Sequence, residues 1–209
     1  MDSLTDEQNT WFNAVRSEDS HNYSSATLLY MEDATQSLVG GLLARAAIST
    51  TCGASCLVNL GNFEDAVNLY SVAASLYERN ADLAVRRSIR ESLWMLLHAY
   101  DYYTLASDYA SSERVSKKYG ELAKRVDRFE TRAIIEILKN RMENVQLAKL
   151  KLESNIKVSP NSNFDDFQII QHSIRNFLQL VRTVSVEKDE LDHVASGSES
   201  DFNEGHIVS

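Results

Sequence analysis

The sequence predicts an all-α protein. Turns need glycine and proline, yet the 209 residues include only seven glycines and one proline, too few for the many turns of an all-β domain. Apolar residues make up 44% of the chain and recur at steps of three and four, the period of a helix with one buried face. A chain of this size can bury a substantial core, so we expect seven to nine helices in one helical domain.

The first predicted region, residues 1–23, is an acidic N-terminal helix followed by a polar break. The helix is expected over Thr5–Arg16, because threonine is a good N-cap, acids follow in the first turn, and the apolar residues share one face. The polar break is Ser17–Asn22.

Residues 24–186 form the predicted helical-hairpin domain. Gly40 and Gly41 should divide the long apolar pattern between residues 24 and 60, because glycine favours a break or bend there. Further breaks are predicted at Gly61–Asn62, Asn80–Asp82, Tyr119–Gly120 and Ser159–Asn163. The helices expected after the glycine pair are Leu42–Leu60, Phe63–Arg79, Leu83–Tyr100, Tyr102–Lys118, Glu121–Asn155 and Phe164–Val186. The last region, residues 187–209, contains SGSES and few apolar residues, so we expect a disordered acidic tail.

The longest predicted helix carries a heptad pattern. Its apolar steps of three and four predict either a core-facing helix or a seam along residues 135–156 through which two copies could form a homodimer. The residues of the pattern are Ile135, Leu138, Met142, Val145, Lys149, Leu152 and Ile156.

Charge is distributed unevenly along the chain. Residues 1–33 and 186–209 each hold seven acids and one base, whereas residues 34–185 hold 16 acids and 19 bases. The sequence therefore predicts a mildly basic helical body with two acidic ends. Such a body is a poor electrostatic match for a phosphate backbone, so nucleic acid is an unlikely partner.

No motif in the sequence indicates catalysis or a cofactor. Gly40-Gly41 lacks the lysine and hydroxyl residue of a phosphate-binding loop, and the five histidines lack the spacing by which one helix presents two metal ligands. Cys52 and Cys56 have no further cysteine or nearby histidine to complete a metal site, so we expect two buried thiols. We therefore expect a non-enzymatic protein without a metal or cofactor.

The segment LGNFEDAVNLYSVAASLY resembles the turn and second helix of a tetratricopeptide repeat. In that family a Leu-Gly pair ends the first helix, an aromatic residue follows two positions later, and alanine, aromatic and alanine line the second helix. These places are taken here by Leu60, Gly61, Phe63, Ala66, Tyr70 and Ala73, with Ala54 as the small residue of the first helix. The resemblance implies hairpins stacked as a short right-handed solenoid, loosely similar to soluble NSF attachment protein adaptors. It also implies an interaction scaffold with no catalytic residues.

Two sets of residues are candidate partner-binding positions. The aromatic set is Tyr70, Trp94 and Tyr103, which could line a concave peptide-binding surface or simply pack a helix hairpin. The basic set could recognise an acidic protein segment or form a solvated face with its neighbouring acids. It comprises Arg86, Arg87, Arg90, Lys117 and Lys118.

The function expected from these observations is that of a protein–protein interaction adaptor that binds a protein or peptide segment, which could be acidic. The alternative is a regulatory protein whose basic helices bind nucleic acid or another polyanion and are masked by the acidic tail. No apolar run is long enough to span a membrane, and residues 1–7 are acidic and polar, so the sequence predicts a cytoplasmic protein.

Overall fold

The computed structural model describes residues 9–126, 128–155 and 164–197, and it places eight α-helices and no β-strand in them. The predicted all-α class is confirmed. The helices are α1 (Thr10–Asp19), α2 (Tyr23–Val39), α3 (Leu43–Asn59), α4 (Phe63–Ala84), α5 (Ile89–Leu105), α6 (Tyr109–Ala123), α7 (Arg128–Asn155) and α8 (Phe164–Gly197).

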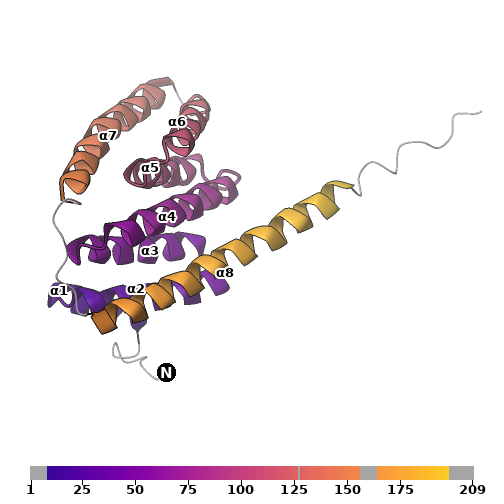
Figure 1. Cartoon of the computed structure of the whole chain (residues 1–209). Coiled ribbons are helices and arrows are strands. Elements are labelled where there is room, and N and C mark those ends of the chain that lie inside the picture. Colours follow the sequence, from indigo (N-terminus) through magenta and orange to yellow (C-terminus); the bar gives the residue numbers. More distant parts are fainter. Residues whose placement is uncertain (1–8, 127, 156–163, 198–209) are drawn as a thin grey trace, which may run out of the picture.

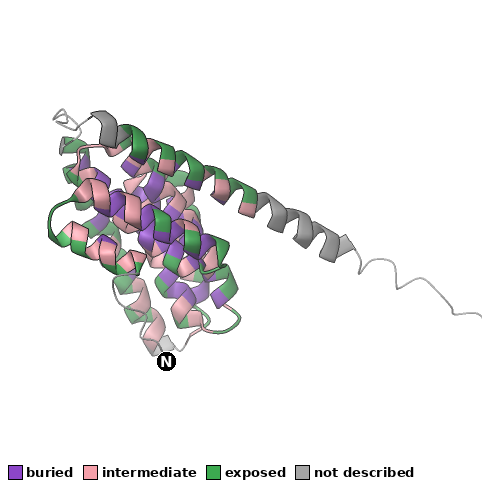
Figure 2. Ribbon diagram, turned by 90° about the horizontal axis from the view of Figure 1, so that it is seen from below, coloured by how far each residue is buried: buried purple, intermediate pink, exposed green. Residues whose placement is uncertain are grey.

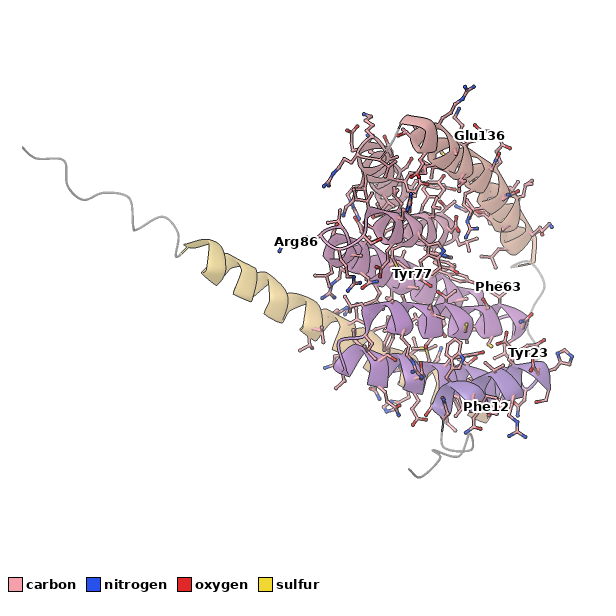
Figure 3. The ribbon with its side chains drawn as sticks, turned by 180° about the vertical axis from the view of Figure 1, so that it is seen from behind. Phe12, Tyr23, Phe63, Tyr77, Arg86 and Glu136 are labelled. Carbon is pink, nitrogen blue, oxygen red and sulfur yellow. The ribbon has the colours of Figure 1, made fainter. Side chains whose placement is uncertain are left out.

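Helices α1 to α6 stack in chain order, each packed against the helix before and after it (Figure 1). Neighbouring helices run in opposite directions. Tyr23 and Phe63, which begin α2 and α4, lie at one edge of the stack, and Arg86, just after α4, lies at the opposite edge (Figure 3). The stack is thus a series of antiparallel hairpins that also includes α1.

Four of the connections between helices have the same geometry. Each consists of three residues, of which the middle one has a positive φ and the third is the N-cap of the next helix. The backbone N–H of each N-cap residue donates to the carbonyl five positions earlier, at 2.8–2.9 Å, and so satisfies the end of the preceding helix. The middle residues are His21, Gly41, Gly61 and Ser107, with φ between 59° and 76°.

Helix α3 lies at a close approach between α2 and α4. A Cβ atom on Gly53 would be only 3.3 Å from Met31 Sδ of α2 and 3.9 Å from Leu69 Cδ1 of α4. Glycine is therefore the residue that lets these three helices meet. The repeat-like alanines Ala54 and Ala66 are also fully buried, in the same core.

Helix α7 packs alongside α5 and α6. Glu130 and Arg141 of α7 pair with Arg90 and Asp101 of α5, so the two helices run in the same direction. The hydroxyl of Tyr119 on α6 donates to the carbonyl of Ile134 at 3.0 Å and ties α7 to the end of the stack.

Helix α8 returns to the beginning of the stack. It packs mainly on α2 and to a lesser extent on α4, and its C-terminal part projects beyond the other helices (Figure 1). Figure 2 shows α8 along one side of a body whose buried residues lie where helices face one another. The packed stripe has the i, i+4, i+7, i+11 spacing of a helix face and consists of Ile170, Ile174, Phe177 and Val181.

Several predicted boundaries are wrong, because tertiary contacts override the turn propensity of single residues. Helix α4 continues through the predicted break at Asn80–Asp82, where Ala81 is fully buried and Asn80 donates to Met95 Sδ of α5 at 3.4 Å. The real turn follows, and Ser88 caps α5 by accepting from the N–H of Glu91. Helix α6 likewise runs through the break predicted at Tyr119–Gly120, because the Tyr119 ring is buried.

Both ends of the described chain also differ from the predicted boundaries. Helix α1 begins at Thr10, where the side chain of Asn9 accepts from the N–H of Phe12, and the predicted cap Thr5 lies outside the described residues. Helix α8 does not end near Val186 but continues to Gly197. Of the tail predicted to be disordered, residues 187–197 are therefore helical, and residues 198–209 lie outside the described part.

The heptad residues of α7 that the structure describes lie mostly toward the interior of the chain, and Ile156 lies outside the described residues. Leu138, Val145 and Leu152 are each at most 8% exposed and belong to the main core, although Met142 is partly exposed. The face predicted as a possible homodimer seam is therefore already packed within the chain.

Candidate functional site

An apolar groove runs between the first halves of α5 and α7. We call it the α5–α7 groove, and its volume is about 360 Å³. Its lining residues are Arg90, Leu93, Trp94, Leu97, Tyr119, Glu130, Ala133, Ile134 and Ile137. Three helices thus contribute to one site, although α5 and α7 are separated in sequence by the whole of α6.

The groove exposes apolar side chains to water. Trp94 on α5 is 46% exposed, and Ile137 on α7 is 51% exposed. Beneath them, Leu93, Leu97 and Ile134 are buried or partly buried and pack on the main core. The floor is therefore rigid, while the rim offers an aromatic and an aliphatic contact surface.

Ion pairs lie at both ends of this apolar surface. Arg90 donates to Glu130 at 2.6 Å, and eleven residues further along the same helices Arg141 donates to Asp101 at 2.6 Å. At 1.5 Å per residue the two pairs are about 16 Å apart along α5. They hold α5 and α7 in register and limit the length of the apolar surface.

A row of stacked rings lies behind Trp94, and we call it the aromatic row. It consists of Tyr70 and Tyr77 of α4 and Trp94, His98 and Tyr102 of α5. Tyr70 stacks on Tyr102 at 5.6 Å between centroids, Tyr77 stacks on Tyr102 at 5.7 Å and on His98 at 5.1 Å, and Trp94 meets His98 edge-on at 4.1 Å. Through these contacts the Trp94 ring is packed against the rings of α4, the helix that carries Tyr77 (Figure 3).

Burial shifts the titration of the groups next to the groove. Burial lowers the pKa of His98 to about 4, with a further contribution from the charge of Arg141, so the imidazole is neutral at pH 7. Burial raises the pKa of Asp101 to about 6, although Arg141 acts in the opposite direction. His98 Nδ1 and Asp101 Oδ1 are both buried without a hydrogen-bond partner. Two polar atoms one turn apart on α5 are therefore able to accept or donate further hydrogen bonds.

The predicted aromatic set does not form one surface. Trp94 is exposed in the groove, but Tyr70 and Tyr103 are only 6% and 5% exposed and belong to the core. Tyr103 lies apart from the aromatic row, where its hydroxyl donates to Glu78 at 3.2 Å under the guanidinium of Arg114. The concave surface lined by these three aromatics is thus replaced by a groove in which only Trp94 takes part.

Most of the predicted basic set is neutralised by carboxylates. Arg87 pairs with Glu91, Arg90 with Glu130, Lys117 with Glu113, and Lys118 with Asp82 and Glu78, all within 4 Å. Arg86 lies at the edge of the stack and forms no ion pair with any other described residue (Figure 3). Arg90 and Lys118 therefore join helices, Arg87 and Lys117 form local i, i+4 pairs, and the five residues do not form one free basic stripe.

Glu78 is the centre of a polar network between α4 and α6. Arg114 donates to it at 2.7 Å and 3.3 Å, and Lys118 lies 3.7 Å away. Burial alone would raise the pKa of Glu78, but the bonds and charges of these cations lower it below its ordinary value. The network fixes α6 against α4 and explains why several predicted binding residues are structural.

The groove residues missed by the sequence analysis are chiefly Ile137 and Leu97, and the pair Asp101–Arg141 just beyond the groove was missed as well. The spacing of the pair could have indicated a contact, because Asp101 and Arg141 are 40 positions apart, as are Arg90 and Glu130. This equal spacing indicates two ion pairs only when α5 and α7 are known to lie parallel and side by side.

The two cysteines do not form a reactive site. Cys52 is half-buried and Cys56 is buried, both are free, and burial raises their pKa values to about 11 and 12, so the thiols are unreactive at pH 7. Within the described ranges, no three His, Cys, Asp or Glu side chains are placed to share a metal ion. None of the helices in this part of the chain combines the length and apolarity needed to span a membrane.

Comparison with known proteins adds no assignment to this geometry. The sequence matches no protein-family model and no curated protein, and the fold matches no solved structure.

Proposed function

We propose that the protein is a non-enzymatic interaction module that binds a segment of a partner protein in the α5–α7 groove. The observation that carries the proposal is the exposure of Trp94 and Ile137 side by side on a rigid apolar floor. Tryptophan contributes strongly to protein interfaces when it is buried at their centre, and here it is held in place by the aromatic row.

The shape of the groove indicates the size of the segment. Ion pairs about 16 Å apart leave room for about three turns of a helix or five extended residues. Such a segment would place one or two apolar side chains on Trp94 and Ile137, with polar groups toward the ion pairs. This is the adaptor function that the sequence analysis favours, and the proposal assigns it to a groove between helices that are not neighbours in the sequence.

The alternative, a polyanion-binding regulator masked by an acidic tail, has weaker support. Four of the five predicted basic residues have carboxylate partners. In addition, residues 187–197 extend α8 as a projecting helix rather than as a flexible mask (Figure 1).

The proposal can be tested with peptides selected from a random display library on the immobilised full chain. Binding should shift the emission of Trp94 to shorter wavelengths in a Trp11→Phe background, in which Trp94 is the sole tryptophan. Ile137→Ser should weaken selected peptides by about tenfold or more, because it removes a central apolar contact. The matched control is Leu150→Ser, a similarly exposed residue of the same helix outside the groove, which should leave Kd within about twofold.

Two results would contradict the proposal. One is equal binding of the selected peptides to both serine variants. The other is binding that leaves the emission of Trp94 unchanged.

A further inference from the structure

A second cleft lies on the opposite flank of α7. We call it the basic cleft. Its volume is about 520 Å³, and it is lined by Lys124, Thr131, Arg132, Ile135, Glu136 and Lys139. On a helix with 100° per residue, Arg132 and Lys139 point about 150° and about 170° away from the mean direction of the α7 residues that line the α5–α7 groove. The two sites are therefore separate.

The cations of the basic cleft are available for a ligand. Arg132 and Lys139 are exposed, and neither forms an ion pair with another described residue. This distinguishes them from Arg87, Arg90 and Lys118, whose charges are neutralised within the chain.

Lys124 is engaged only weakly. Its partner is Glu121 at 2.6 Å, and both side chains are more than 60% exposed. An exposed pair of this kind is worth about 0–1 kcal/mol, so an incoming anion can replace the carboxylate at little cost. Three cations thus line the cleft beside one acid, Glu136, which forms no ion pair with another described residue and lies on α7 (Figure 3).

The backbone around the cleft is held in place. Thr131 donates its hydroxyl to the carbonyl of Ala123 at 3.0 Å and so fixes the first turns of α7 against the end of α6. Lys124 follows directly after α6, and Arg132 and Lys139 belong to α7. The cations therefore come from two elements whose relative position is set.

We propose that the basic cleft binds a phosphate monoester. A guanidinium and two ammonium groups match the tetrahedral oxygens of a terminal phosphate, and two negative charges are needed to balance the net excess of the cleft. The volume fits a small phosphorylated group. Acids near the cleft, among them Glu121 and Glu143, disfavour a long polyanion such as nucleic acid.

The test is calorimetric titration of the full chain with phosphoserine, and with a phosphoserine peptide beside its unphosphorylated form. We expect saturable binding of phosphoserine that weakens at least about fivefold when pH falls from 7.5 to 5, because the second phosphate proton binds near pH 6. The double variant Arg132→Gln/Lys139→Gln should lose about tenfold or more in affinity. The control Lys151→Gln removes an exposed charge from the same helix outside the cleft and should bind like the wild type.

The comparison between the phosphopeptide and free phosphoserine distinguishes the two possible sources of the phosphate group. Tighter binding of the phosphopeptide than of phosphoserine supports a phosphorylated protein side chain, and equal binding supports a phosphorylated small molecule. Absence of saturable binding, or equal losses in the double variant and Lys151→Gln, overturns the proposal. The Ile137→Ser variant should bind phosphoserine normally, so failure at the groove and failure at the cleft are distinguishable.

Discussion

Arg141 of α7 donates from Nε to Asp101 Oδ2 of α5 at 2.6 Å, and this pair fixes the register of two helices that are not neighbours in the chain. The Asp101 side chain is 11% exposed, whereas the arginine side chain remains 43% exposed. The pair therefore joins a buried charge to a solvated one, about one helical turn beyond the residues that line the α5–α7 groove.

Removal of the arginine should destabilise the protein, because it leaves a buried carboxylate without a counter-charge. We expect Arg141→Met to lower the free energy of unfolding at pH 7 by about 1–3 kcal/mol, with a smaller loss at pH 5, where protonation neutralises Asp101. Urea denaturation followed by circular dichroism measures both values. Arg87→Met removes an exposed i, i+4 pair and should cost less than about 0.5 kcal/mol, so equal losses would refute the role of burial.

His98 should make the fold sensitive to acid. Its pKa is about 4 in the folded chain against an ordinary 6.5, so its contribution to stability is complete above pH 6.5 and is lost as pH falls toward 4. Asp101 has the opposite sign, since its raised pKa gives a contribution that is present below pH 4 and lost as pH rises through about 6. In the wild type, the two groups therefore change the free energy of unfolding in opposite directions as pH changes.

His98→Phe should remove the contribution of His98 to the pH dependence of stability while keeping an aromatic ring stacked on Tyr77. Relative to the wild type, the variant should gain stability on the order of 2–3 kcal/mol as pH falls from 6.5 to 4. The measurement is the free energy of unfolding at pH 6.5, 5 and 4. The control His172→Phe changes an exposed histidine of α8, and its free energy of unfolding should change with pH as that of the wild type does. If His98→Phe also showed the pH dependence of the wild type, His98 would not be the acid-sensitive group.

The shared turn geometry predicts opposite effects at Ser107 and Gly41. Both have a positive φ, which costs a non-glycine residue about 1–2 kcal/mol, partly offset by the greater unfolded-state entropy of glycine. Ser107→Gly should therefore raise, and Gly41→Ala lower, the free energy of unfolding by about 0.5–1 kcal/mol. Gly40→Ala in the same turn is the control, since Gly40 has φ −76° and only ordinary contacts, and identical effects at Gly40 and Gly41 would disprove the argument.

The heptad face of α7 should prove essential for folding. Leu138→Glu places a charge at a site that is 7% exposed and should unfold the chain or cost more than about 3 kcal/mol. Leu147→Glu on the exposed side of the same helix should leave the circular dichroism spectrum unchanged. Sedimentation velocity adds the decisive comparison, because a folded monomer of Leu138→Glu from a dimeric wild type would mean that the face joins two copies.

Part of the candidate site could be predicted from the sequence. Trp94 and Arg90 are binding candidates by residue type, and both line the α5–α7 groove. Tyr70 and Tyr103 are candidates for the same reason, yet they are buried, because their exposure depends on which helices cover them. Residue type alone could not distinguish the two situations.

The sequence by itself determined the helical class, the turns at Gly41 and Gly61 and the buried alanine positions, because helical periodicity and the φ preference of glycine act over a few residues. The tertiary structure alone decided that α7 lies parallel to α5, that α8 returns to α2, and that Ile137 meets Trp94 across a groove. Such relations join residues about 40 or more positions apart. They are set by the total packing of side chains and by ion pairs such as Asp101–Arg141, which no local pattern encodes.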